Sequence, residues 1–122
     1  MFVNISNHPS AQWESLQFEE ACRCGEVVDY SFPQISPFMD EMELSILADK
    51  VVSDVTSLVA CDYKHTVLHI MGEMTLTYML VARFSQLGYR CVASTTERTA
   101  EIYPDGTKIS HFKFIRFREY QA

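Results

Sequence analysis

The chain has 122 residues, of which 48% are hydrophobic and 21% charged, and such a composition is typical of a single compact domain over residues 1–122. Its net charge of −6 argues against binding to long nucleic acid, because such affinity needs many Lys and Arg contacts to phosphates. No stretch approaches ~18 consecutive apolar residues and the start lacks a signal peptide's basic and apolar regions, so we expect a cytoplasmic protein that contacts no membrane.

The first half of the chain predicts strands that alternate with helices. Residues 1–6 are a short apolar strand, and a helix is expected from residues 9–10 to about residue 23, with Ser10 as its N-cap. Residues 26–31 predict a second strand. Over residues 40–60 the apolar side chains recur every three to four positions, which indicates a helix lying on a sheet.

The second half continues this alternation and then changes. Residues 65–72 predict a third strand, residues 74–87 a helix and residues 89–95 a fourth strand. Strands that alternate with helices favour an α/β fold with a mainly parallel sheet. Residues 99–120 instead place a Pro-Asp-Gly turn between two β-rich runs, so we expect a C-terminal β-hairpin.

The last strand of this hairpin mixes apolar and cationic residues on both faces. Strand alternation places Phe112, Phe114 and Arg116 on one face, and Ile115 and Phe117 on the other. We therefore expect both faces to be covered, and Arg116 to contact a second subunit or a bound phosphate.

Ligands of parallel α/β sheets bind beyond the carboxyl ends of the strands, where three predicted loops meet. These loops are residues 6–10, 71–75 and 94–98, and the first two precede helix N-termini, whose free N–H groups favour phosphate. The candidate ligand-binding residues are Ser6, Asn7, Ser10, Gly72, Glu73, Met74, Thr75, Thr95 and Arg116. His8 is added as a candidate acid or base.

Several of these residues have a purely structural alternative. The polar side chains of residues 6–10 could satisfy a turn and cap a helix. Gly72 could only end a strand, or let a ligand approach the backbone, and Glu73 could be a solvated first-turn acid or orient a ribose hydroxyl. His65, His69 and His111 are expected to be structural.

The cysteines predict neither disulfides nor a metal site. Cys22 and Cys24 point in different directions on a helix end, and Cys61 with His65 has no second pair at ligand spacing. We therefore expect four buried or idle thiols, no metal and no cofactor.

Three motifs in order, GEMTLTY, CVASTTER and FKFIRFREY, resemble a known family over residues 66–120. They are similar to the small stand-alone CRISPR-associated proteins with a CARF-type, Rossmann-like, three-layer fold that act as ring nucleases on cyclic oligoadenylate. The matching residues are Gly72, Thr77, Tyr78, Thr95, Thr96, Arg98, Arg116, Phe117, Arg118 and Tyr120.

The resemblance implies a homodimer whose subunits enclose one cyclic RNA, with cyclic tetra-adenylate as the expected ring. Cleavage would be metal-independent, by attack of a ribose 2′-OH on the neighbouring phosphate, and would switch off type III CRISPR signalling. Arg98 with Thr95 and Thr96 would stabilise the pentacoordinate phosphorane, and His8 would protonate the departing 5′-oxygen. The expected catalytic residues are His8, Thr96 and Arg98.

Two other functions remain open at this stage. The first is a sensor or sponge that binds the same cyclic nucleotide at the same site without cutting it. The second is a Rossmann-like enzyme acting on a mononucleotide, which the missing G-x-G-x-x-G fingerprint disfavours.

Overall fold

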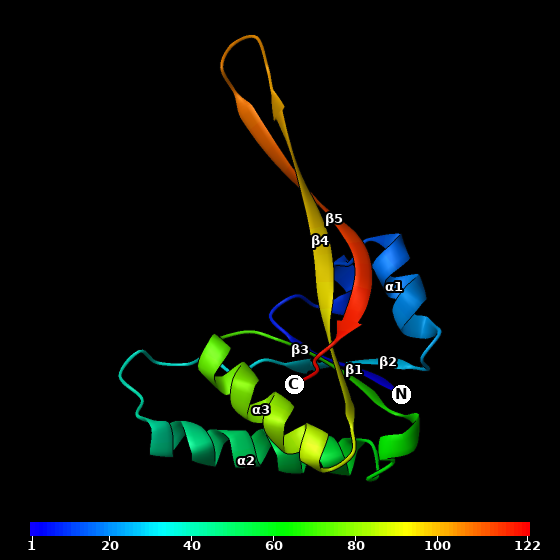
Figure 1. Ribbon diagram of the computed structural model, residues 1–122, viewed down its shortest axis with the longest axis vertical. Helices are drawn as coiled ribbons and strands as arrows, with labels where there is room; N and C mark the ends of the chain where they lie inside the picture. The colour runs from blue at the N-terminus through cyan, green and yellow to red at the C-terminus, as the bar shows by residue number, and fades with distance from the viewer.

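The computed structural model describes residues 1–122 as one five-stranded sheet with helices on both faces (Figure 1). The strands are β1 (Phe2–Ser6), β2 (Val27–Ser31), β3 (Val67–Met71), β4 (Arg90–Ile102) and β5 (Lys108–Glu119), in the spatial order β2-β1-β3-β4-β5. The helices are α1 (Ser15–Cys22), α2 (Glu41–Leu58) and α3 (Met74–Gln86), with 3-10 helices η1 (Ser10–Gln12) and η2 (Tyr63–His65). The first four strands are parallel and β5 is antiparallel to β4, which confirms the expected α/β class and C-terminal hairpin.

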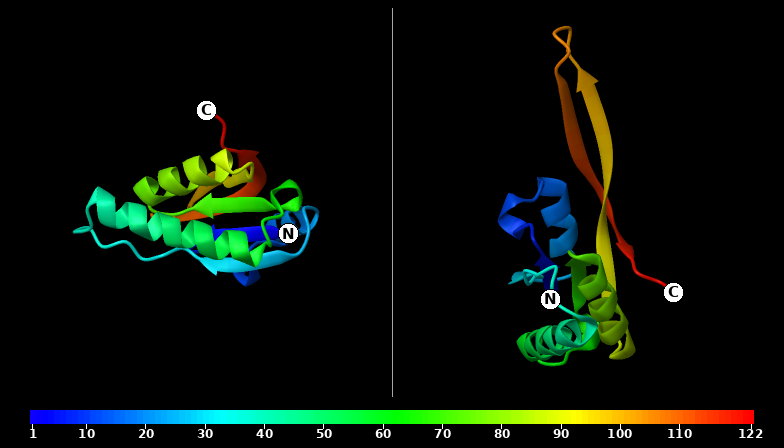
Figure 2. Two further views of the ribbon diagram at one scale, coloured as in Figure 1. Left: turned by 90° about the horizontal axis from the view of Figure 1, so that it is seen from below. Right: turned by 90° about the vertical axis from the view of Figure 1, so that its left-hand side faces the viewer.

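The main core lies between the sheet and the pair α2 and α3, which run side by side over one face (Figure 2). Because side chains alternate along a strand, Val3 and Ile5 of β1 enter this core while their neighbours face the other side. α2 contributes buried residues at the expected helical spacing: Leu44, Ala48, Val51 and Val55. Each buried Leu or Val side chain of this set stabilises the fold by roughly 1.5–3 kcal/mol.

The opposite face of the sheet is only partly apolar. Phe2, Val67 and Val92 pack there with Ala21 of α1 and form a smaller buried cluster. One pleat further towards the strand ends, the same face presents the polar residues Asn4 and His69, which lie side by side in the parallel register of β1 and β3. The candidate site is built around this polar layer.

The first helix begins later than the sequence predicts. Ser10 starts the short helix η1 and caps no α-helix, whereas α1 begins at Ser15 with Glu14 at its N-cap position. The Ser10 backbone N–H and Oγ both donate to the Asp29 carboxylate, at 3.2 Å and 3.1 Å. The prediction of Ser10 as an N-cap is wrong because its side chain bonds to Asp29 on β2 instead of to a helix N-terminus.

β4 is one long strand rather than a short strand followed by a loop. Residues 94–98, expected as a loop, stay extended because they pair with β5 as far as Ile102. An irregularity between Thr95 and Thr96 marks the point at which the hairpin leaves the body of the molecule. We call residues 96–114 the arm, and Figure 1 shows it projecting far beyond the helices.

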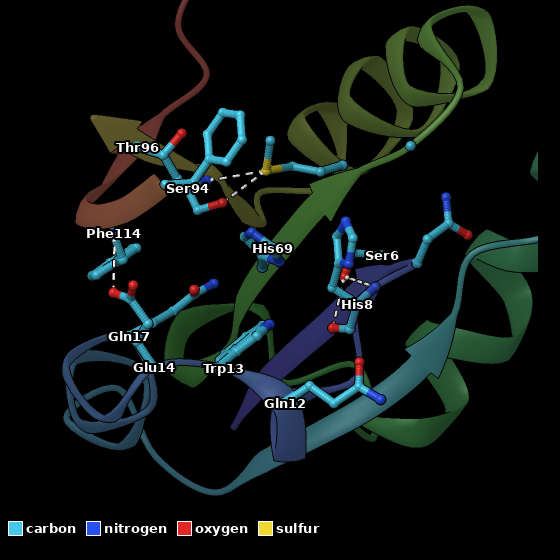
Figure 3. A pocket seen from close by; sticks show the side chains of 14 residues that line it. Ser6, His8, Gln12, Trp13, Glu14, Gln17, His69, Ser94, Thr96 and Phe114 are labelled. Atoms are coloured by element: carbon cyan, nitrogen blue, oxygen red, sulfur yellow. Dashed lines mark hydrogen bonds between the residues drawn. The ribbon is translucent and has the colours of Figure 1, made fainter. Parts of the chain in front are cut away.

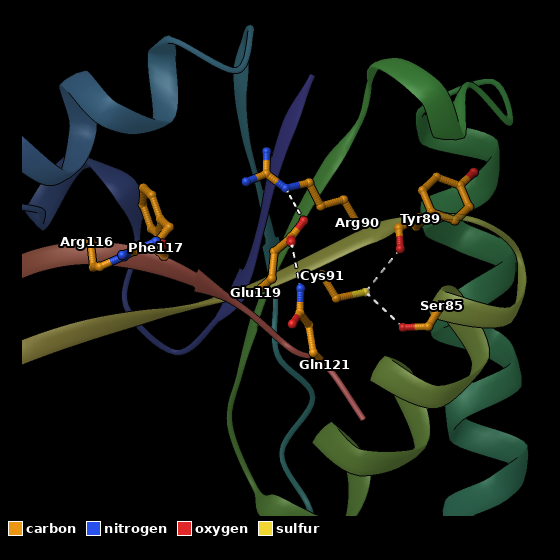
Figure 4. Close-up of polar contacts among 8 residues, drawn as sticks. All are labelled: Ser85, Tyr89, Arg90, Cys91, Arg116, Phe117, Glu119 and Gln121. Carbon is orange, nitrogen blue, oxygen red and sulfur yellow. Dashed lines mark hydrogen bonds and ion pairs between the residues drawn. The ribbon is translucent and has the colours of Figure 1, made fainter.

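The arm carries exposed apolar side chains in the single chain. Ile102 is 76% exposed and Phe112 is 61% exposed, whereas Phe114 at the base of the arm is buried. The prediction that both faces of the last strand are covered is therefore wrong for this chain alone. At the other end of the hairpin an Arg90–Glu119 ion pair joins β4 to β5 beside the buried Cys91 (Figure 4).

The thiols and helices add two further observations. Cys22 and Cys61 are exposed, Cys24 is partly buried, and burial raises the pKa of the Cys91 thiol to about 11. None of the helices has both the length and the apolar character that crossing a membrane would need.

Candidate functional site

A pocket of about 740 Å³ opens at the carboxyl ends of β1 and β3 and beside the middle of β4, on the face that carries α1 (Figure 3). This is the region where ligands bind in parallel α/β sheets. The pocket is lined by Ser6, Asn7, His8, Gln12, Trp13, Glu14, Gln17, His69, Met71, Gly72, Ser94, Thr96, Phe112 and Phe114. Its wall thus combines the loop after β1, the end of β3, the segment before α1 and the base of the arm.

The buried Asn4 holds the loop after β1 in place. Its Nδ2 donates to the His8 carbonyl and to Asp29 Oδ1, each at 2.9 Å. Its Oδ1 accepts from Ser6 Oγ at 2.7 Å. The Ser6 hydroxyl also accepts from the His8 backbone N–H at 3.2 Å. The polar groups of Asn4 and Ser6 therefore set the loop conformation, and the His8 side chain is left exposed at the pocket.

The N-terminus of α3 is already occupied by the protein's own carboxylate. Glu73 accepts from the backbone N–H groups of Thr75 and Leu76 at 3.0 Å and 2.9 Å, and from Thr75 Oγ1 at 2.6 Å. These hydrogen bonds, that of the Thr75 hydroxyl first, lower the pKa of Glu73. The N–H groups expected to bind a phosphate are thus taken by Glu73. Met74 is exposed and does not line this pocket.

Gly72 has a packing role at the junction of β3 and α3. A Cβ atom at this position would lie 2.5 Å from the ring of Phe32. Only glycine therefore lets the buried Phe32 pack under the loop. Gly72 also lines the pocket, so its position is compatible both with the packing of Phe32 and with the approach of a ligand to the Gly72 backbone.

The predicted threonines have different surroundings. Thr96 lines the pocket from the start of the arm. The Thr95 hydroxyl instead donates to the Arg116 carbonyl at 3.1 Å and accepts from the Arg116 N–H at 3.3 Å, so it fills the gap at the strand irregularity.

The predicted arginines lie outside the pocket of their own chain. Arg98 is on the arm, where its Nη2 donates to Ser110 Oγ at 3.1 Å and its guanidinium lies 5.8 Å from the centre of the Phe112 ring. Arg116 Nε donates to the Phe117 carbonyl at 3.3 Å. No Lys or Arg is among the residues that line the pocket.

The structure therefore gathers part of the predicted site. Those brought together at the pocket are Ser6, Asn7, His8, Gly72 and Thr96. Those that lie outside it are Ser10, Glu73, Met74, Thr75, Thr95, Arg98 and Arg116.

Other pocket residues were missed in the sequence. Trp13 and Phe112 supply aromatic surface, and Glu14 Oε2 accepts from the Phe114 backbone N–H at 3.0 Å, which fastens the base of the arm to the start of α1. His69, for which the sequence predicts only a structural role, lines the pocket as well. The signal that could have found it is a polar residue in each of two apolar strands, Asn4 and His69, at positions that become neighbours when the strands pair.

His69 is the most perturbed ionisable group of the pocket. It is 2% exposed, its Nδ1 lies 2.9 Å from Asn4 Oδ1, and Trp13 and Phe117 each meet its ring edge-on at 5.5 Å. Burial, together with the nearby His8, lowers the pKa of His69 to about 4. The imidazole is therefore neutral at physiological pH.

No group of three or more His, Cys, Asp or Glu side chains comes together as a metal site.

Comparisons with known proteins place the chain in a family. Searches of the curated proteins and of the solved structures find no significant match to the chain. The sequence model of the family described as "Uncharacterized protein MJ1673 family" matches residues 1–118, so the chain belongs to the MJ1673 family.

Proposed function

We propose that the pocket binds cyclic oligoadenylate, with cyclic tetra-adenylate as the ring, and that the protein is a ring nuclease acting as a homodimer. The observation that carries the proposal is the lining of the pocket, which combines aromatic rings at Trp13 and Phe112 with uncharged hydrogen-bonding groups at the strand ends. Aromatic side chains stack on bases, and polar groups read base and ribose edges.

The size of the pocket supports a shared site. Pockets of about 300–1,000 Å³ enclose a drug-sized ligand, and the volume of about 740 Å³ lies in this range. A ring of four nucleotides is larger than such a ligand. Two pockets related by a two-fold axis would hold it together, which matches the symmetry of the ring.

The position of the cations supports the same arrangement. The pocket of one chain has no Lys or Arg, whereas the arm carries Arg98 beyond the pocket. In a homodimer the arm of one subunit would bring its Arg98 to the phosphates held by the other. Arginine offers several fixed donors to a phosphate, and their effect grows as charge builds up in the transition state.

The proposed reaction needs no metal. The loops would hold a ribose 2′-OH in line with its neighbouring phosphate. The 2′-OH would give its proton to water and its oxygen would bond to phosphorus as the 5′-oxygen leaves, giving a 2′,3′-cyclic phosphate. His8, exposed at the pocket, would protonate the leaving oxygen, and Thr96 would contact the phosphate. Destruction of the ring would end type III CRISPR signalling.

A sensor or sponge is the second candidate. The Glu73 carboxylate fills the N-terminus of α3 and the pocket of one chain lacks cations, which favours binding without phosphate chemistry. Incubation of the protein with labelled cyclic tetra-adenylate in EDTA separates the candidates. A ring nuclease would give a 2′,3′-cyclic phosphate product. A ring that is bound but stays intact would support the sensor or sponge instead.

A further inference from the structure

One buried polar atom of the pocket has no partner in the protein. The Nε2 atom of His69 is buried without a hydrogen bond, and the only other side-chain atom in this condition is Thr77 Oγ1 on α3. His69 also lines the pocket, and Figure 3 shows its ring among the labelled pocket side chains. A buried polar atom left unpaired costs about 1–3 kcal/mol, so its lack of a partner calls for an explanation.

The hydrogen bonds of Asn4 fix the protonation of this ring. Asn4 Nδ2 donates to two oxygen atoms, those of the His8 carbonyl and the Asp29 carboxylate, which settles the orientation of the amide. Asn4 Oδ1 is then an acceptor, and His69 Nδ1, at 2.9 Å, must carry the proton that it accepts. Because the imidazole is neutral, Nε2 has no proton and presents a lone pair.

The surroundings of the ring offer this lone pair no donor. Phe2, Trp13 and Phe117 surround the ring with aromatic carbon, and the neighbour of His69 on β4 is Val92. The ionisable groups nearby are His8, Glu14 and, through Asn4, Asp29. None of them donates a hydrogen bond to Nε2.

We infer that His69 Nε2 accepts a hydrogen bond from an O–H or N–H group of the ligand, so that the pocket selects ligands carrying a donor at this point. The Asp29–Asn4–His69 chain of hydrogen bonds keeps the acceptor in one tautomer. If the ligand is the cyclic oligoadenylate of the proposed function, on which this step rests, the donor is a ribose hydroxyl or the adenine amino group. His69 is thus a binding residue that accepts a hydrogen bond from the ligand, in addition to packing against Phe2, Trp13 and Phe117.

Nitrogen NMR of the protein labelled with ¹⁵N-histidine tests this inference without assuming the nucleotide. Phenol and anisole share an aromatic ring, which can pack near Trp13 and Phe117. Only phenol has a hydroxyl that can donate a hydrogen bond to the Nε2 lone pair. We expect phenol, and not anisole, to shift the His69 Nε2 resonance, with the exposed His65 unaffected. An equal response to both probes, or none to phenol, would overturn the inference.

Cyclic tetra-adenylate in the same titration separates the two proposals. A response to phenol without binding of the ring would support the role of His69 as a hydrogen-bond acceptor and exclude the proposed ligand. Binding of the ring without a response to phenol would support the proposed ligand and exclude this role of His69. Rings with 2′-O-methyl ribose or with N6-dimethyladenine then identify the donor, and the one that lacks it should bind about tenfold more weakly or worse. Equal affinity of all three rings would contradict the inference.

A pair of variants controls for structural effects. His69→Phe, which removes the acceptor, should lose the preference for phenol over anisole, and His65→Phe, at an exposed site, should keep it. An unchanged preference in a folded His69→Phe protein would overturn the inference. If His69→Phe does not fold, the NMR of the parental protein still decides the question.

Discussion

The body of the molecule and the arm are built from the same backbone ladder but are held by different forces. In the body, strands of 5 residues at β1 and β3 are buried nearly throughout by α2, α3 and α1. In the arm, strands of 13 and 12 residues continue past the helices, and the side chains of residues 96–113 are exposed. A two-stranded ribbon is marginally stable alone in water, so we expect the body to fold by itself. In the proposed homodimer, the partner subunit would support the arm.

The largest contrast between the two regions is in stability. Phe84→Ala in α3 removes a fully buried ring and should lower the free energy of unfolding by about 3–5 kcal/mol. Ile102→Ser, near the tip of the arm, should change it by less than about 0.5 kcal/mol at concentrations where the chain is a monomer. Urea unfolding of both variants measures this. A large loss from Ile102→Ser in a monomer would contradict the description of the arm as unsupported.

The second effect is on the rate of ring cleavage and tests whether Arg98 of the arm takes part in the proposed reaction. Arg98→Ala should lower the cleavage rate about a hundredfold or more, roughly 3 kcal/mol, while weakening binding less. Arg98→Lys should recover binding better than rate, because lysine lacks the paired donors of the guanidinium. Single-turnover cleavage and equilibrium binding measure both quantities. A folded Arg98→Ala protein that cuts at the parental rate would remove Arg98 from the mechanism.

Mixed dimers show whether the arm acts on its own pocket or on its partner's. His8→Ala chains mixed with Arg98→Ala chains should regain about a quarter of the parental rate, because half of the dimers are mixed and each contains one intact site of two. Rates that stay at the level of the separate variants would place Arg98 in the pocket of its own chain.

The third effect is on the pH dependence of the body. The pKa of His69 is lowered from 6.5 to about 4 on folding, so between these values the unfolded chain binds more protons than the folded one. Stability is therefore retained above pH 6.5 and lost as the pH falls towards 4, by about 2 kcal/mol between pH 7 and pH 5. Urea unfolding at both pH values measures this loss. His69→Gln should reduce it, and an identical loss in that variant would assign it to other groups.

The smallest effect concerns the junction of the two regions. Glu14→Ala removes the acceptor for the Phe114 backbone N–H and should cost about 1 kcal/mol. The amide hydrogen of Phe114 should then exchange faster with solvent than in the parental protein. Glu19→Ala, an exposed position on α1, is the matched control and should leave this exchange unchanged. Unaltered exchange in Glu14→Ala would show that Glu14 does not fasten the arm.

The fold could be predicted where burial determines the pattern. The apolar spacing of α2 and the runs of β1 and β3 follow directly from packing on a sheet, and the Pro-Asp-Gly turn indicated the hairpin. The sequence predicts a loop over residues 94–98 because these residues are as polar as a typical loop. They remain a strand because β5 satisfies their backbone, which is a non-local fact.

The site was predictable in position more than in detail. Its place at the strand ends, and the presence there of His8, Gly72 and Thr96, follow from the parallel topology. The role of Glu73 as a cap depends on its rotamer, and the pairing of Asn4 with His69 depends on strand register. Neither rotamer nor register can be read from the spacing of residues in one chain.

The most direct test of the account is the stoichiometry of cyclic tetra-adenylate binding, measured by calorimetry in EDTA with an Arg98→Ala protein that cuts slowly. We expect one ring bound for every two chains, with light scattering reporting a dimer, because in the proposed homodimer each pocket would enclose part of the ring and the arms would complete the site. Saturation at one ring per chain, or no heat of binding to a folded protein, would contradict it.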